Sequence, residues 1–234
     1  MSPGSDLEKD RAAWARWWHL LTGTAVLAGL VIQIILVARL ASAPRNTNSG
    51  VIAGATIAGR YLRTISFFTI QSNILAAVTA LQLARKPDRD GRAWRALRLA
   101  ALLGITVTGI VYATVLARIH EPKGWEQVTT NTLFHYVSPV AMVLGWLAFG
   151  PRPRITWSTL VAALSWPAAW FAYTLARGAA DRWYPYPFVD VVTHGYVRVI
   201  VNGLIVTVVL GAVGLLYRAG DQWLPWTPGS GGPP

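Results

Sequence analysis

Residues 60–75 read RYLRTISFFTIQSNIL and open an apolar segment that continues to Ala84. Its first turns carry two arginines, Arg60 and Arg63, and polar side chains that include Thr64, Ser66, Gln71, Ser72 and Asn73. Polar groups inside a membrane-spanning helix cost free energy unless they face a partner or a water-filled cavity. The stretch therefore predicts a helix that crosses a membrane and carries part of a site near its start.

The composition of the whole chain agrees with this interpretation. Hydrophobic residues make up 53% of the sequence and charged residues only 13%. Several apolar runs approach or exceed roughly 18 residues, and a bilayer core of about 30 Å needs roughly 20 residues of helix to cross. Backbone groups must be satisfied internally in lipid, and the runs are too long and too uniformly apolar for a β-barrel. We predict an all-α, polytopic membrane protein built as a bundle of six transmembrane helices.

The runs predict one membrane domain over residues 14–218. It lies between a polar tail at 1–13 and a disordered, Gly- and Pro-containing tail at 219–234. The predicted spans cover residues 17–40, 61–84, 97–119, 132–149, 157–176 and 191–217.

Six spans place both termini on the same side of the membrane. Near the span ends, 12 lysines and arginines fall on the side of the termini and 9 on the opposite side. Because cytoplasmic loops carry the excess of Lys and Arg, the termini are expected to be cytoplasmic. The formal charge of +11 is therefore explained by topology and by anionic lipid headgroups, so membrane lipids are the expected partners and nucleic acid is not. The chain has no Cys, which excludes thiolate nucleophiles and iron–sulfur clusters, and we expect no cofactor.

Polar residues gather at the span ends opposite the termini, while the other halves of the same spans are almost purely apolar. Such segregation predicts a cavity, half the membrane deep, with the aromatic run 183–188 at its mouth. On the last span the polar residues recur every fourth position, as along one helical stripe. The candidate set is Arg63, Thr64, Gln71 and Asn73 of the second span, Arg118 of the third, Asn131 and His135 of the fourth, and Asp190, His194, Arg198 and Asn202 of the last.

The chemistry available in this set is limited. A hydroxyl beside an imidazole is the minimal nucleophile pair, a carboxylate can orient the base, and an arginine or amide can stabilise an oxyanion. The sequence has no Gly-x-Ser-x-Gly, His-Glu-x-x-His or glycine-rich phosphate loop. Spacing alone leaves other interpretations open: a helix-capping Thr64, a packing His135, a structural Asp190–Arg198 pair, or a zinc site from His135, His194 and Asp190.

The chain resembles a known family in several short motifs. These are the order of the spans, Thr64 and Gln71 at the opening of the second span, His135 with Pro139 in the fourth, and Tyr-Pro-Phe at 186–188. Together they resemble the bacterial Pr6Pr family of membrane proteins, which is similar to the eukaryotic androgen-induced / androgen-dependent-TFPI-regulating family. The eukaryotic relatives are six-span intramembrane threonine hydrolases that cleave fatty acid esters of hydroxy fatty acids.

The resemblance implies Thr64 as nucleophile and His135 as base, acting on a fatty-acyl or lipid ester in a bacterial plasma membrane. The rest of the candidate set is expected to bind substrate, because it lies at the same ends of the spans. The sequence departs from the eukaryotic pattern at Arg63, at Ser66 and Asn73, and in the spacing between His135 and its proline. The alternative is a non-enzymatic membrane protein with a lipid-binding or regulatory role. A small transporter is disfavoured, because no inverted repeat is evident.

Overall fold

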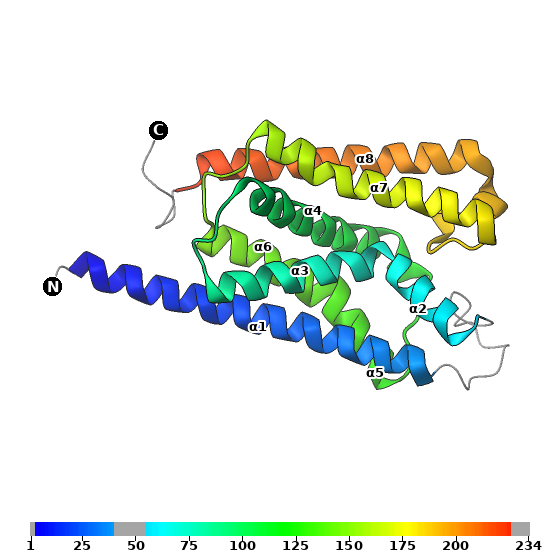
Figure 1. Cartoon of the computed structure of the whole chain (residues 1–234), viewed down its shortest axis with the longest axis horizontal. Helices are drawn as coiled ribbons and strands as arrows, with labels where there is room; N and C mark the ends of the chain where they lie inside the picture. Colours follow the sequence, from blue (N-terminus) through cyan, green and yellow to red (C-terminus); the bar gives the residue numbers. More distant parts are fainter. Residues whose placement is uncertain (1–2, 40–54, 226–234) are drawn as a thin grey trace.

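The computed structural model describes residues 3–39 and 55–225, and within these ranges every regular element is a helix (Figure 1). The long helices are α1 (Pro3–Arg39), α2 (Ile57–Ser66), α3 (Phe68–Arg85), α4 (Arg92–Thr114), α5 (Gly124–Thr132), α6 (Ser138–Phe149), α7 (Trp157–Asp181) and α8 (Val191–Trp223). A π turn, Leu133–Val137, joins α5 to α6, and short 3₁₀ turns follow α4 at Leu116–Arg118 and precede α8 at Pro187–Val189.

The helices confirm the all-α part of the predicted fold class. In the described ranges five helices are long and apolar enough to cross a membrane, or six if the bent pair α2 and α3 is one span. The start of α1 and the end of α8 lie at the same end of the bundle, here called the terminal end (Figure 1). Helix α2 and the segment 182–190 lie at the other end, here called the distal end.

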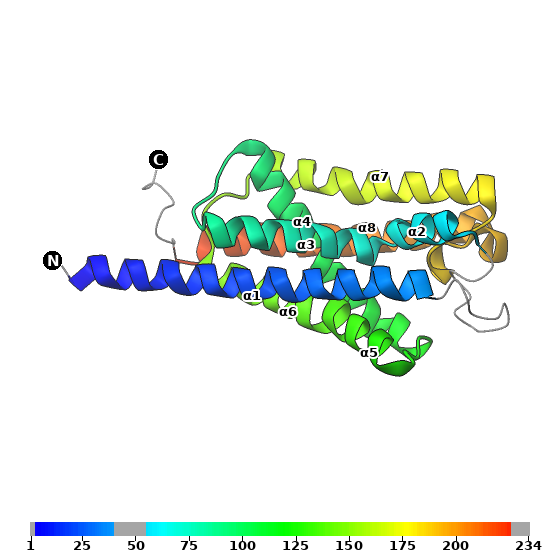
Figure 2. The same cartoon turned by 60° about the horizontal axis from the view of Figure 1, so that its bottom comes forward.

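Apolar side chains are distributed as in a protein surrounded by lipid. Helices α3 and α4 lie between α1 and α7 (Figure 2), and α4 supplies the centre of the core with the fully buried Leu99, Leu103 and Ile105. The outer face of α8, by contrast, exposes large apolar side chains such as Val208 (70%) and Leu216 (71%). Water would disfavour such a continuous apolar face, whereas lipid tails do not.

The second predicted span is not one helix, so the prediction of an unbroken span over 61–84 is wrong. Helices α2 and α3 meet at an angle of 72°, and Phe67 between them has an extended backbone (φ −67°, ψ 129°). At the break, the backbone carbonyls at the end of α2 lose their helical N–H partners and accept hydrogen bonds from side chains of α7 and α3 instead. The Trp170 indole N–H donates to Ser66 O (2.9 Å), and the Gln71 amide donates to Ile65 O (3.0 Å). A broken helix is tolerated at membrane depth only where such partners exist.

Gln71 should stabilise this break measurably. Its amide oxygen also accepts from the Trp166 indole (3.2 Å), so Gln71→Leu leaves a carbonyl and an N–H without partners. We expect the free energy of unfolding to fall by about 1–3 kcal/mol, measured by denaturant unfolding in detergent micelles. Gln82→Leu is the matched control, because the buried oxygen of Gln82, on the same helix, has no hydrogen-bond partner among the described residues. Equal losses in the two variants would contradict this role for Gln71.

The fourth span begins earlier than the predicted residue 132 and contains the π turn. Pro139 has no N–H to bond the carbonyl of His135, four residues before it, which favours a widened turn at this point. The Asn73 amide on α3 donates to Phe134 O within that turn (3.4 Å) and to Thr69 O (2.9 Å). The two irregular spans, the second and the fourth, are therefore braced against each other.

Helices at both termini are longer than predicted. Helix α1 begins at Pro3, inside the predicted polar tail. Helix α8 continues to Trp223, past the predicted end at 217, because the buried Asp221 accepts hydrogen bonds from the backbone N–H groups of Arg154 (2.5 Å) and Ile155 (2.6 Å). The predicted disorder of residues 226–234 lies outside the described residues.

Candidate functional site

A cavity of about 390 Å³ opens at the distal end of the bundle. Its walls come from α1, the break between α2 and α3, the end of α4, the span with the π turn, and the loop before α8. Three of the predicted site residues line it: Thr64, Asn131 and His135. Residues of the second and fourth predicted spans thus line one hollow away from the termini, whereas no residue of the last span lines it.

Thr64 lines the cavity from the last turn of α2, which ends two residues later at Ser66. Its side chain is 7% exposed, and its hydroxyl donates to the carbonyl of Arg60 on its own helix (2.8 Å). A Thr hydroxyl on a helix commonly makes this bond to the preceding turn, and it is weak enough to be exchanged for another acceptor.

His135 is held in one orientation by two contacts. Its Nδ1 lies 3.1 Å from the carbonyl oxygen of Asn131, and its ring stacks on that of Tyr112 at a centroid distance of 3.9 Å. A carbonyl oxygen only accepts, so Nδ1 carries the proton in the neutral ring. The Nε2 of the neutral imidazole therefore keeps its lone pair, as a general base requires.

Thr64 and His135 stand on the wall of the same cavity without a hydrogen bond between them. Each of these side chains makes its hydrogen bond to a carbonyl of its own span, and no hydrogen bond joins the two side chains among the described residues. The amide oxygen of Asn131, also on this wall, is buried and has no partner within the described ranges. The cavity thus holds a hydroxyl, an imidazole and an amide whose oxygen has no partner among the described residues.

Other polar cavity residues were not in the predicted set. His120 follows the third span in a short loop, and burial lowers the pKa of its imidazole below the ordinary value. Tyr186 comes from the aromatic run expected at the mouth, and its hydroxyl accepts from the Thr69 N–H (3.0 Å) and pairs with the Thr69 hydroxyl (3.1 Å). Burial raises the pKa of Tyr186 to about 12, so it stays protonated at neutral pH. The one sequence signal for a site role of His120 and Tyr186 is that each lies in a loop close to the end of a predicted span.

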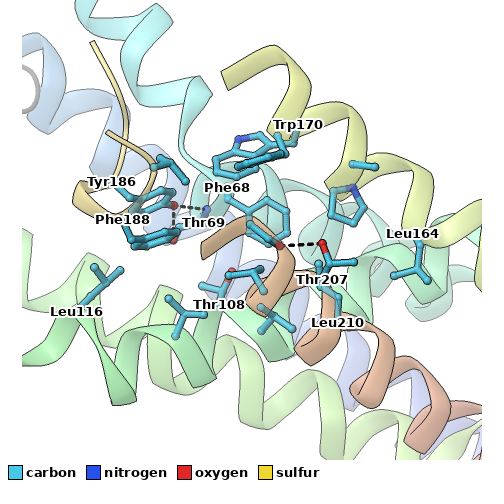
Figure 3. A pocket seen from close by; sticks show the side chains of 18 residues that line it. Phe68, Thr69, Thr108, Leu116, Leu164, Trp170, Tyr186, Phe188, Thr207 and Leu210 are labelled. Carbon is cyan, nitrogen blue, oxygen red and sulfur yellow. Dashed lines mark hydrogen bonds between the residues drawn. The ribbon is translucent and has the colours of Figure 1, made fainter. Parts of the chain in front are cut away.

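A second, apolar cavity of about 350 Å³ adjoins the first. It lies between α4, α7 and α8, and Figure 3 shows Tyr186 and Phe188 on one side of it and Leu164 and Leu210 on the other. Thr69, Leu116 and Tyr186 line both cavities. A polar chamber and an apolar chamber therefore share one wall.

Four predicted residues of the second and third spans lie away from the cavity lining. Gln71 and Asn73 brace the two irregular spans, as described above. The Arg63 guanidinium lies over the Trp183 ring at 5.2 Å from its centroid, and Arg118 is exposed. For Gln71, Asn73 and Arg63 the structure gives a local packing role.

The predicted stripe on the last span does not face the cavity, which corrects that part of the prediction. Gly195 has φ 73° and ψ 162°, so the helical repeat is interrupted between His194 and Arg198, and both side chains are exposed. Asp190 instead caps α8 by accepting from the Val192 (2.9 Å) and Thr193 (3.3 Å) N–H groups. Asn202 donates to the carbonyl of Phe188 (2.8 Å).

The zinc interpretation finds no support in this arrangement. His194 is exposed on α8, whereas His135 lines the cavity. Across residues 3–39 and 55–225, no group of three or more His, Asp or Glu side chains is placed to hold a metal ion.

Comparison of the chain with protein-family models, with curated proteins and with solved structures finds no match.

Proposed function

We propose that the protein is an integral membrane hydrolase of fatty-acyl or lipid esters, with Thr64 as nucleophile and His135 as base. One observation carries the proposal: a buried hydroxyl and an oriented imidazole, from different spans, line the same distal cavity. The resemblance of these two positions to those of the bacterial Pr6Pr family and its eukaryotic threonine-hydrolase relatives adds to it.

The proposed reaction begins when the Thr64 hydroxyl exchanges its bond to the Arg60 carbonyl for one to His135 Nε2. The Thr64 oxygen then attacks the ester carbonyl, and its proton passes to Nε2. The C–O bond of the ester breaks, and the leaving alkoxide takes the proton from the imidazolium. Water, deprotonated by the same Nε2, then attacks the acyl-threonine. The C–O bond to Thr64 breaks, the Thr64 oxygen takes the proton back from the imidazolium, and the free acid is released.

The two cavities suit the two parts of such a substrate. The ester group would meet Thr64 in the polar cavity, and the acyl chain would lie in the apolar cavity between α4, α7 and α8. The protonated Tyr186 hydroxyl and the Asn131 amide, both on the polar wall, are the groups available to donate to an oxyanion.

Filling the apolar cavity should shorten the preferred acyl chain. Thr108 on α4 lines this cavity and is 5% exposed (Figure 3), so Thr108→Phe replaces a small side chain with a bulky one. We expect kcat/KM for long-chain esters to fall by about tenfold while short-chain esters are spared, because one misfit hydrocarbon contact costs on the order of 1–3 kcal/mol. Thr114→Phe, an exposed position on the same helix, is the control. An unchanged chain-length profile would contradict this assignment.

The activity itself is tested with a series of fluorogenic acyl esters of increasing chain length. The purified protein in detergent or lipid nanodiscs is expected to hydrolyse them with a preference for long chains. Failure to turn over any ester would refute the proposal.

The orientation that we propose follows from charge, since the terminal end carries the Lys- and Arg-rich loops, which supports cytoplasmic termini. The bacterial plasma membrane that we propose as the location follows from the resemblance to the Pr6Pr family.

A non-enzymatic lipid-binding role is the second candidate. It is favoured by the hydroxyl of Thr64, which donates to its own helix rather than to His135. In that case the two cavities would retain a lipid through purification, and no ester would be turned over.

A further inference from the structure

A second site stands out at the terminal end, far along α1 and α3 from the distal cavity. An open groove of about 630 Å³ runs between these two helices. Three basic side chains line it, together with apolar ones and no acid: Lys9, Ala12, Ala13, Arg16, Trp17, Leu20, Leu81, Ala84 and Arg85.

The groove forms where α1 and α3 separate. Farther along α1, Gly23 is in close contact with Leu81: a methyl group at Gly23 would lie 2.7 Å from the Leu81 side chain. Toward the terminal end the lining includes the small Ala12, Ala13 and Ala84, and Leu20 and Leu81 form an apolar floor beside Arg16 and Arg85. A cationic rim over an apolar floor matches a ligand with an anionic head and a hydrocarbon chain.

Arg16 and Arg85 differ from other arginines at this end. Arg98 donates to Gly150 O (2.7 Å) and Arg218 to Ile155 O (2.8 Å), so these guanidinium groups are used within the protein. Arg16 and Arg85 form no hydrogen bond or ion pair with any residue in the described ranges, and both are exposed. Two guanidinium groups with free donors on one groove favour a shared anionic ligand.

The level of the groove along the membrane normal indicates which kind of anionic ligand it binds. Trp17 in the groove is 60% exposed, and the nearby Trp14 is 69% exposed. Exposed tryptophans on a spanning helix lie at the level of lipid headgroups. Basic pockets between spanning helices at this level bind anionic headgroups.

We infer that this groove binds an anionic phospholipid. Arg16 and Arg85 hold its phosphate from either side, and one acyl chain lies along Leu20 and Leu81. The site is independent of the proposed hydrolase activity, since it shares no residue with either distal cavity.

Native mass spectrometry of the purified full chain, titrated separately with phosphatidylglycerol and phosphatidylcholine, tests the inference. Wild type should bind phosphatidylglycerol selectively. The double variant Arg16→Gln, Arg85→Gln should lose about thirtyfold in affinity for it, because each of the two basic residues near a membrane surface contributes about 1 kcal/mol. The Arg16→Lys, Arg85→Lys variant should retain most of the selectivity, which also shows that the groove is still folded.

The matched control is Lys86→Gln with Arg92→Gln, which removes the same charge from exposed positions at the same end but outside the groove. It should leave the selectivity unchanged. Equal losses in the control and the groove variant would show that general charge is responsible and would overturn the inference. Equal binding of the two lipids by wild type, or displacement of the lipid by inorganic phosphate alone, would overturn it as well.

Discussion

Replacing Thr64 with Ala should abolish ester turnover, lowering kcat/KM by at least about a thousandfold, because no other group would form the acyl intermediate. The fold should be affected little. The lost hydroxyl bonds only to a carbonyl of its own helix, and such bonds contribute little to stability. The measurement is initial-rate kinetics with a long-chain fluorogenic ester, alongside the yield of folded protein.

Thr130→Ala is the matched control for this substitution. Thr130 lines the same cavity and is buried like Thr64, and its hydroxyl likewise donates to the carbonyl four residues earlier, that of Glu126 (3.0 Å). Thr64→Ser should retain part of the activity, since it keeps the hydroxyl. Full activity in Thr64→Ala, or an equal loss in Thr130→Ala, would refute the role of Thr64 as nucleophile.

The variant His135→Asn should lower kcat by about 10²–10⁴-fold, the usual contribution of a general base. Asn keeps a polar side chain at this position but has no basic nitrogen. The stacking on Tyr112 and the bond to the Asn131 carbonyl are also lost, so thermal unfolding should be measured in parallel.

His120→Asn separates the two imidazoles of the cavity. His120 also lines the cavity, and burial lowers its pKa, so it too is neutral at neutral pH. No hydrogen bond to a described residue fixes its ring, whereas Nδ1 of His135 is fixed. We therefore expect His120→Asn to keep most of the activity. If His120→Asn is inactive and His135→Asn is active, the general base is His120 and not His135.

Much of this arrangement can be predicted from the sequence. Long apolar runs define the helices, because the bilayer imposes their length and the backbone must be satisfied within each segment. The convergence of Thr64, Asn131 and His135 follows from the direction of the spans alone, since the start of the second and that of the fourth lie at the same end of the bundle.

The break at Phe67 could not be predicted, since neither Pro nor Gly occurs between residues 60 and 75. It depends on donors from α7, about a hundred positions away in sequence: the Trp170 indole to Ser66 O, and the Arg177 guanidinium to Leu62 O (3.0 Å). Partners so distant in sequence produce no recognisable pattern in the residues around Phe67.

The prediction of one polar stripe along the last span was wrong for a local reason. A repeat of four residues predicts one face only while the helix is regular, and Gly195 at φ 73° interrupts it. Glycine adopts that conformation without strain, so the presence of Gly195 within the stripe argues against a regular helix at this point.

The central claim is that Thr64 acts as a nucleophile activated by His135 across the distal cavity. The most direct test is to treat the purified protein with a fluorophosphonate probe and to locate the adduct by peptide mass spectrometry. We predict one adduct on Thr64, absent in Thr64→Ala and formed far more slowly in His135→Asn. No labelling of the wild-type protein, or an adduct on any other residue, would contradict the claim.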